Sequence, residues 1–190
     1  MKIFTTKMLL FLYISFKTKL EEDILIREAN LNDVDAIMDI IKQIIAEMKE
    51  SKNTQWDETY PRAEDFKKDI EEGCLYVDEF KGDLVGFICV NDSEPEEYKD
   101  IDWISDEKAL VLHRMGINPK YRRQGKAKNL IRYAENLAMR NGIMYLKTDT
   151  NSMNTKMRSL FKTCGFRFAG EMDFLGKPDP FYCYDLKLNV

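Results

Sequence analysis

The sequence predicts a single α+β domain with a mixed β-sheet flanked by helices. Segments of strand composition come singly and in a run of three, separated by amphipathic helices, in the order β-α-α-β-β-β-α-β-α-β. No repeat or linker divides the 190 residues, a length that can bury a substantial core. The proportions of hydrophobic residues (44%) and charged residues (33%) are ordinary for a globular chain.

A short first strand is predicted at residues 24–27. Asn30, with Asp33 three residues later, predicts a capped helix start, although aspartate replaces the usual glutamate. Apolar residues at spacings of three and four then predict one buried helix face, formed by Val34, Ile37, Met38, Ile41, Ile44, Ile45 and Met48.

A second, more polar helix is predicted at residues 63–72 and ends at Gly73. Strands at 74–80 and 84–90 flank residues 81–83, whose glycine indicates a hairpin. Residues 92–107 form a polar loop with eight acidic residues against one lysine, together with Tyr98 and Trp103. We expect most of this loop to be a solvated connection.

The second half opens with a strand at 109–117 that Pro119 ends, because proline has no N–H for the ladder. The helix after it stops at Gly142 and has an apolar stripe of Ala127, Leu130, Ile131, Ala134, Leu137 and Ala138. A strand at 143–148, a helix at 153–164 and a strand at 181–188 complete the order.

Residues 117–127 predict an anion site. The helix-opening amides, Gly125 and four surrounding cations suit a diphosphate; the cations are Arg122, Arg123, Lys126 and Lys128. The site is not a P-loop, because Lys120 and Ala127 stand where that motif needs glycine and Ser/Thr. Without a hydroxyl for Mg²⁺, nucleotide hydrolysis is disfavoured.

The spacing Arg122-x-x-Gly125-x-Ala127 resembles the (Gln/Arg)-x-x-Gly-x-(Gly/Ala) motif of the GNAT N-acetyltransferase superfamily. Residues 154–166, which begin with Asn154 and end in Gly-Phe, resemble its second signature. The resemblance covers roughly residues 24–188 in element order. It implies a mostly antiparallel sheet, and we expect residues 23–190 to be the GNAT-like domain.

The resemblance implies acetyl-CoA as cosubstrate, held where two central strands splay apart, and no metal. The backbone at Met115 and Ile117 would pair with the pantetheine arm. Asn154 would touch the cofactor or orient the backbone, and otherwise caps its helix. The pyrophosphate would lie against the amides of Arg123, Gln124, Gly125, Lys126 and Ala127, with Arg122 nearby.

His113, the only histidine, lies on the strand that would line this cleft, at a spacing found in related arylalkylamine acetyltransferases. It is a candidate general base, and the alternative is a histidine packed on the sheet. Phe161 stands where many GNAT members have a tyrosine that protonates the thiolate, and is assigned to the cofactor wall. Another donor, such as Tyr145, could replace it.

The acceptor end is predicted around Trp56, Asp57, Glu58 and Tyr60, with the loop at 92–107 and Trp103 leaning over it. Carboxylates and aromatic faces suit a cation such as a polyamine, an aminoglycoside or a lysine side chain. Trp56 and Trp103 are the candidate substrate contacts.

The predicted function is transfer of an acetyl group to a primary amine of a small molecule or peptide, by direct attack in a ternary complex. The alternative is an acyl-CoA-binding regulatory or interaction module with little turnover, motivated by Phe161. The net charge of −4 disfavours nucleic acid as a partner. A homodimer through the terminal strands is left open.

Four scattered cysteines and a lone histidine disfavour a Cys/His zinc site and predict reduced thiols in a cytoplasmic protein. Residues 1–22 contain an apolar run at 8–16, too short to span a bilayer as a helix. We interpret residues 1–22 first as an appended segment or start-site artefact, then as a peripheral membrane contact, and last as a secretion signal. No stable membrane insertion is expected.

Overall fold

The fold is a seven-stranded sheet with the strand order β1-β2-β3-β4-β5-β7-β6. The computed structural model describes residues 25–188; residues 1–22, predicted as an appended segment, lie outside them. The strands are β1 (Leu25–Glu28), β2 (Leu75–Phe80), β3 (Asp83–Asn91), β4 (Leu110–Ile117), β5 (Tyr145–Asn151), β6 (Arg167–Met172) and β7 (Phe181–Lys187). The helices are α2 (Val34–Glu50), α3 (Ala63–Glu71), α4 (Lys126–Arg140) and α5 (Thr155–Thr163), with 3₁₀ turns η1 (Leu31–Asp33), η2 (Glu96–Asp100) and η3 (Pro119–Tyr121).

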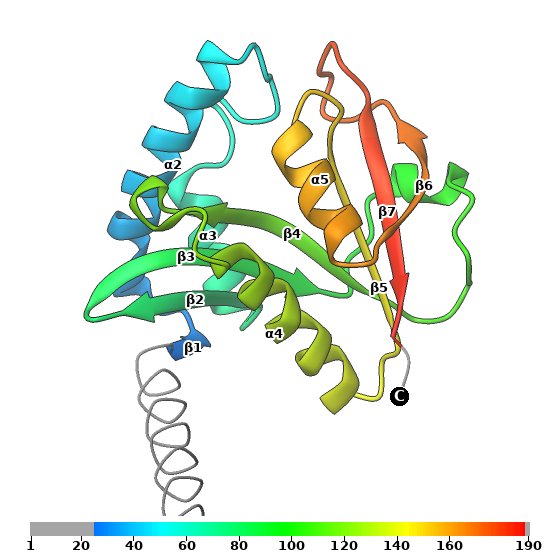
Figure 1. Cartoon of the computed structure of the whole chain (residues 1–190), viewed down its shortest axis with the longest axis horizontal. Helices are drawn as coiled ribbons and strands as arrows, with labels where there is room; N and C mark the ends of the chain where they lie inside the picture. Colours follow the sequence, from blue (N-terminus) through cyan, green and yellow to red (C-terminus); the bar gives the residue numbers. More distant parts are fainter. Residues whose placement is uncertain (1–24, 189–190) are drawn as a thin grey trace, which may run out of the picture.

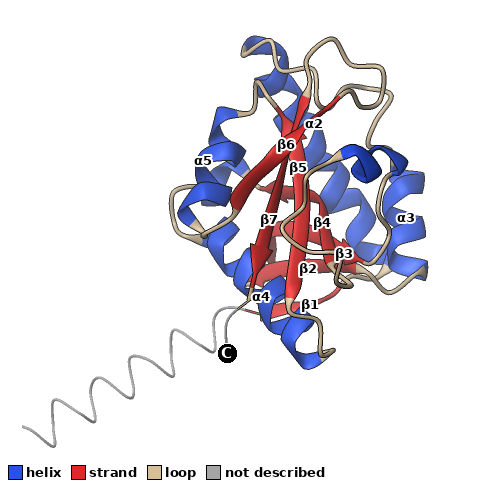
Figure 2. Ribbon diagram, turned by 90° about the vertical axis from the view of Figure 1, so that its right-hand side faces the viewer, coloured by secondary structure: helices blue, strands red, loops and turns tan. Residues whose placement is uncertain are grey.

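Helices cover both faces of the sheet, with α4 and α5 on one side and α2 and α3 on the other (Figures 1 and 2). Each face has its own core, because successive strand residues point to opposite sides. On β3, Ile88 and Val90 pack in the α4/α5 core, whereas Phe87 and Cys89 pack in the α2/α3 core.

The predicted α+β class is confirmed, and the sheet is mostly antiparallel: among the strands of residues 25–188, only β4 and β5 pair in parallel. The capping box of Asn30 and Asp33 is also confirmed, at the η1 turn that leads into α2. The hairpin between β2 and β3 turns at Lys81 and Gly82, which both have positive φ, as a tight two-residue turn requires.

One strand was not predicted. β6 pairs only with β7 and forms the edge of the sheet. Its residues Arg167 and Phe168 are both exposed, so the alternation of apolar and polar side chains that identifies a half-buried strand is missing. The order therefore contains one strand more than the sequence indicates. Among residues 25–188, no helix combines the length and apolar character needed to cross a bilayer.

Candidate active site

A cleft opens where the parallel pair of strands separates. β4 and β5 are paired only from Leu110 to Leu112, opposite Leu146 to Thr148, and each strand then continues without the other. The cleft between them encloses about 670 Å³ and is walled by α2 on one side and α5 on the other. In Figure 1, α2 lies to the left and α5 to the right above β4, and β5 runs beside α5.

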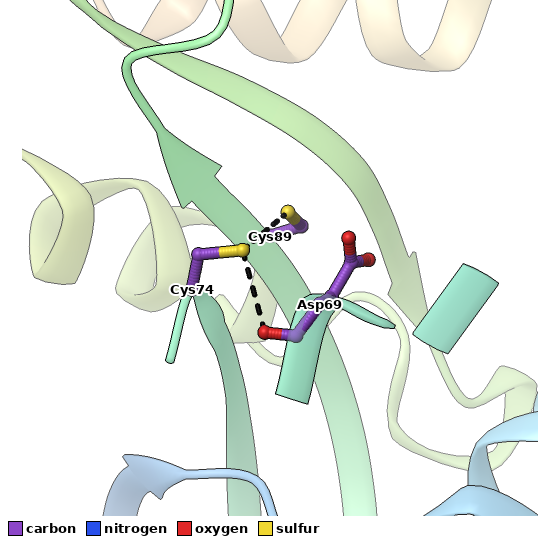
Figure 3. A group of neighbouring side chains, drawn as sticks. All are labelled: Asp69, Cys74 and Cys89. Carbon is purple, nitrogen blue, oxygen red and sulfur yellow. Dashed lines mark hydrogen bonds between the residues drawn. The ribbon is translucent and has the colours of Figure 1, made fainter. Parts of the chain in front are cut away.

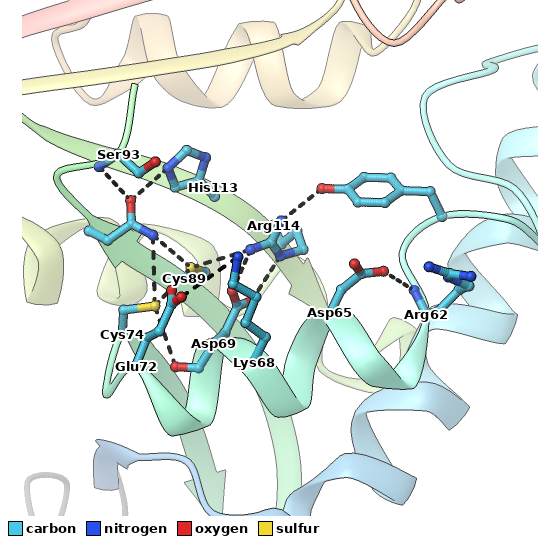
Figure 4. Close-up of polar contacts among 12 residues, drawn as sticks. Arg62, Asp65, Lys68, Asp69, Glu72, Cys74, Cys89, Ser93, His113 and Arg114 are labelled. Carbon is cyan, nitrogen blue, oxygen red and sulfur yellow. Dashed lines mark hydrogen bonds and ion pairs between the residues drawn. The ribbon is translucent and has the colours of Figure 1, made fainter. Parts of the chain in front are cut away.

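A bulge in β4 shapes the cleft wall. Between the pairs Phe87–Gly116 and Cys89–His113, β4 has one residue more than β3. Such a bulge leaves the extra residue outside the ladder and re-aims side chains. Here the consecutive residues His113 and Arg114 both join one polar network, His113 through Asn91 of β3 and Arg114 through Asp69 of α3 (Figure 4).

The predicted anion site lies at the N-terminus of α4, beside the cleft. Gly125 is the N-cap residue with a φ of +77°, a conformation that glycine adopts without strain. Within the described residues 25–188, no side chain caps this helix end, and its first turn has no acidic residue. A Cβ added at Gly125 would meet nothing within 4 Å. The first-turn amides are therefore available to an anion, and Ala127 lines the cleft.

The cations around Gly125 do not all face this site. Arg122 lines the cleft and donates to the carboxylate of Glu47, while Arg123 lines an adjoining hollow with Lys156. The buried Lys126 ammonium instead lies 3.4 Å from Asp78 on β2. The prediction that its charge joins the cradle is thus corrected, because α4 presents this side chain to the sheet. Gln124 and Gly125 are exposed, and neither lines the cleft.

Besides Arg122 and Ala127, four further residues predicted at the cofactor line the cleft: Met115, Ile117, Asn154 and Phe161. The Asn154 side chain caps α5 by accepting from the Met157 amide, and also donates to Gln55 at 2.8 Å. Its predicted alternative role as a helix cap is therefore present. Phe161 is 2% exposed and packs against the rings of Phe166 and Tyr184.

At the acceptor end, the structure separates the two predicted tryptophans. Trp56 lines the cleft. Trp103 does not; its indole donates to the Tyr98 carbonyl, and the ring packs on Tyr98 in a separate apolar cluster. The loop leans over the cleft through other residues, Glu94, Pro95 and Glu97. Tyr145 also lies outside the cleft, because its hydroxyl is buried against Asp185.

A buried polar network supports the bulge from the α3 side (Figure 4). Arg114 donates to the carboxylate of Asp69 through Nε at 2.8 Å and through Nη2, and to the Tyr60 hydroxyl at 2.8 Å. The side-chain oxygen of Asn91 accepts from Nε2 of His113 at 2.9 Å and from the Ser93 amide at 3.0 Å. The side-chain amide of Asn91 donates toward the sulfurs of Cys74 and Cys89. The hydrogen bond from Arg114 fixes the position of the Tyr60 hydroxyl, and Tyr60 lines the cleft.

Asp69, Cys74 and Cys89 lie close enough together to suggest a metal centre (Figure 3). Their other contacts point to a different role. The Arg114 guanidinium is bound to both carboxylate oxygens of Asp69 and also lies 3.8 Å from the Cys89 sulfur. Because a buried cation already neutralises this carboxylate, we interpret the group as part of the polar network.

His113 lines the cleft, as a general base must. Burial, with a further contribution from the Arg114 charge, lowers its pKa to about 4. The imidazole is therefore neutral at pH 7 and can accept a hydrogen bond or a proton. A proton acceptor with this pKa is weak at neutral pH, because a catalytic pKa works best near the working pH.

Sequence reasoning missed Asp149, Glu97 and Gln55, which all line the cleft. Gln55 joins the α2–α3 loop to the opposite wall by accepting from Thr150 at 3.0 Å and from Asn154. Asp149 lies within β5 and follows Thr148, the last residue of that strand that pairs with β4. The sequence signal available for Asp149 was its position directly after the strand predicted at 143–148, since functional side chains of α/β sheets gather at the carboxyl ends of parallel strands.

The sequence of this chain is similar to those of known acetyltransferases. The sequence model of the Acetyltransferase (GNAT) family matches residues 41–166. The uncharacterized N-acetyltransferase YhfO of Bacillus subtilis (strain 168) is 24% identical over 141 residues, which are 74% of this chain and 88% of that protein.

Solved structures show the same architecture. A GNAT-family acetyltransferase from Streptococcus agalactiae 2603 superposes with a TM-score of 0.76 and 25% identity, covering 88% of this chain and 96% of that one. The yncA protein of Salmonella typhimurium, solved with its cofactor acetyl-CoA, has a TM-score of 0.64 and 16% identity, with coverages of 88% and 95%. At 16% identity, the similarity to yncA shows a shared fold alone.

Proposed function

The chain belongs to the GNAT acetyltransferase family, and from this premise we propose that it transfers an acetyl group from acetyl-CoA to a primary amine by direct attack in a ternary complex. The observation that carries the proposal is the cleft between β4 and β5, which begins beside the uncapped N-terminus of α4. An extended thioester fits the first feature, and its diphosphate fits the second.

The N-terminus of α4 and the cleft would bind different parts of acetyl-CoA. The amides of residues 123–127 would hold the diphosphate, and the left-handed Gly125 lets the backbone approach it closely. Met115 and Ile117 on β4 and Phe161 on α5 would line the pantetheine arm. When bound, acetyl-CoA supplies an activated acyl carbon. The yncA complex supports this placement at the level of the fold.

The amine arrives protonated, since an alkylamine has a pKa of about 10.4, and must lose a proton before it can attack. His113 lies in the cleft as a neutral imidazole and stays a candidate for handling that proton. The departing thiolate has no tyrosine at position 161 to protonate it. A thiol pKa near 8.5 makes the thiolate a tolerable leaving group without one.

The buried Phe161 also favours the second candidate, an acyl-CoA-binding module with little turnover. Calorimetric titration with acetyl-CoA, run beside free CoA, tests the feature that both candidates share. We expect saturable one-site binding. A panel of primary amines then separates them: the enzyme releases free thiol with at least one amine, and the module with none. A well-folded protein that binds neither ligand contradicts both candidates.

Replacing Ala127 with glutamate should weaken acetyl-CoA binding by at least about tenfold, because a carboxylate would face the diphosphate at the helix N-terminus. Thermal stability should not fall, since an acidic residue in a first turn favours a helix by about 0.3–1 kcal/mol. The matched control is Asn136→Glu, which adds the same charge on the exposed face of α4. Equal affinities of the two variants would contradict the proposed position of the diphosphate.

We also propose that the protein is cytoplasmic. All four cysteines are free thiols in the described part of the chain, which supports a reducing compartment.

A further inference from the structure

We propose that Asp149 removes the proton from the acceptor's ammonium group, and that Asp149 and Glu97 together make the acceptor site selective for amines carried on an apolar body. This inference rests on the acetyl transfer proposed above. It identifies a proton acceptor other than His113 and narrows the class of acceptor.

Asp149 lies where the acceptor must meet the thioester. It is the first residue of β5 beyond the parallel ladder, so it stands at the point where the two strands separate. His113 and Arg114 occupy the corresponding place on β4, across the cleft. A group at this position is close to any acyl carbon held between the strands.

The carboxylate of Asp149 is held in a fixed orientation. Tyr98, which is 1% exposed, donates its hydroxyl to Oδ2 at 2.8 Å. The other oxygen, Oδ1, has no hydrogen-bond partner within residues 25–188. Oδ2 is thus held by Tyr98, and Oδ1 can accept a hydrogen bond or a proton from a ligand.

The charges around Asp149 leave it uncompensated. Glu97 lies near enough to act on it by charge, and across residues 25–188 neither carboxylate has an ion-pair partner. The basic groups nearby are already paired: Lys147 contacts Glu94 at 2.7 Å, and Arg114 is bound to Asp69. Two carboxylates without a cation, at the end of a cleft, attract an ammonium group.

Part of the wall at this end is apolar. Trp56, Phe174, Leu175 and Phe181 form this part. The rings of Phe174 and Phe181 pack together at 5.4 Å, and Trp56 is only 6% exposed. Such a surface favours the hydrocarbon or aromatic body of an amine over a chain of further charges.

An N–H bond of the ammonium breaks, and its proton goes to Oδ1 of Asp149. The freed nitrogen lone pair forms a bond to the acetyl carbonyl carbon while the carbon–sulfur bond breaks. The second proton on nitrogen is transferred to the thiolate sulfur, and Asp149 returns its own proton to water. The first transfer turns an ion pair into two neutral groups, which a desolvated site favours.

The titration of Asp149 agrees with this role. Burial raises its pKa to about 6; the Tyr98 hydrogen bond opposes the rise and the Glu97 charge adds to it. A base with this pKa is ionised at pH 7 and remains close to the working pH. The titratable or charged groups that face it from neighbouring elements are Glu94, Glu97, Tyr98, Tyr60, His113, Arg114 and Cys183.

The first test is Asp149→Asn, assayed with n-hexylamine as a primary amine on an apolar body. The variant should lower kcat by about 10²–10⁴-fold, the usual range for loss of a general base, while acetyl-CoA affinity stays within about twofold of the wild type. A kcat within about threefold of the wild type would overturn the role of Asp149.

The second test is the pH profile of kcat/KM. The wild type should lose activity below about pH 6, the pKa of Asp149. Glu97→Gln should move this acid limb to lower pH, because a neighbouring negative charge is removed, and Tyr98→Phe should move it to higher pH, because a donor to the carboxylate is removed. The matched control Glu96→Gln, a neighbour that pairs with Lys99 and does not line the cleft, should leave it unchanged.

The pH profile also distinguishes Asp149 from His113. An acid limb near pH 4 that neither Glu97→Gln nor Tyr98→Phe moves would match the pKa of His113 and overturn the assignment to Asp149.

The acceptor class is tested by binding alone. In calorimetric titrations of the CoA-bound protein, n-hexylamine should bind more tightly than 1-hexanol and 6-aminohexanoate, and Glu97→Gln should reduce that preference. Equal binding of the three compounds would overturn the proposed selectivity. If the wild type binds acetyl-CoA but acetylates no amine, the proposed function fails. The binding comparison still shows whether Asp149 and Glu97 select for an ammonium group.

Discussion

Replacing Asp69 with asparagine should lower the free energy of unfolding by about 3–5 kcal/mol, the usual cost of leaving one member of a buried ion pair without its partner. The pair is well shielded, with 3% of the Asp69 side chain and 18% of the Arg114 side chain exposed. The amide would leave the guanidinium charge uncompensated between α3 and β4. Urea unfolding monitored by circular dichroism measures the change.

The matched control for this prediction is Glu71→Gln, the same chemical change at an exposed position of α3. It should alter the unfolding free energy by less than about 0.5 kcal/mol. The double variant Asp69→Leu/Arg114→Met should recover most of the loss, because two apolar groups need no charge partner. An Asp69→Asn variant as stable as Glu71→Gln would show that the pair contributes little.

The same network predicts that the acceptor end is sensitive to residues that do not line it. Arg114 is held by Asp69 and in turn donates to the hydroxyl of Tyr60, a cleft residue. Loss of Asp69 therefore affects both stability and the cleft wall. The single and double variants separate these effects, because the double variant restores packing without restoring the hydrogen bond to Tyr60.

Most of the fold could be predicted because the helices and central strands have strong local signals. The stripe of α2 and the glycines that end α3 and α4 gave each element in nearly its observed position. β6 has no such signal. It is an edge strand whose Arg167 and Phe168 are exposed, and only its pairing with β7 makes it a strand. That pairing is a tertiary contact, which periodicity does not report.

The site was predictable where the backbone defines it and less so where side chains do. The motif around Gly125 indicated the uncapped start of α4, because a glycine at a helix entrance reflects backbone geometry. The direction of Lys126, which pairs with Asp78, depends on a strand 48 residues earlier in the chain. Asp149 was missed for the same reason, since its contact with Tyr98 joins β5 to a turn in the acidic loop.

Replacing Asp149 with asparagine should stabilise the protein at neutral pH while it removes the proposed base. Burial raises the pKa of this carboxyl to about 6, against 3.8 for the free group, so the folded chain holds the proton more tightly than the unfolded chain. Wild-type stability should therefore fall as pH rises from about 4 to 6 and then level off. Asparagine has no charge to bury, so the variant escapes this loss.

The expected gain from Asp149→Asn is about 2–3 kcal/mol in unfolding free energy at pH 7–8, and close to zero at pH 4. Urea titrations of both proteins at pH 4, 5, 6 and 8 measure it, with Glu96→Gln as the control that should show no such trend. A variant less stable than the wild type at pH 8 would contradict the pKa shift. A variant that is more stable but inactive would show that the ionised Asp149 lowers the stability of the fold and is needed for activity. Such a trade-off is expected of a catalytic group.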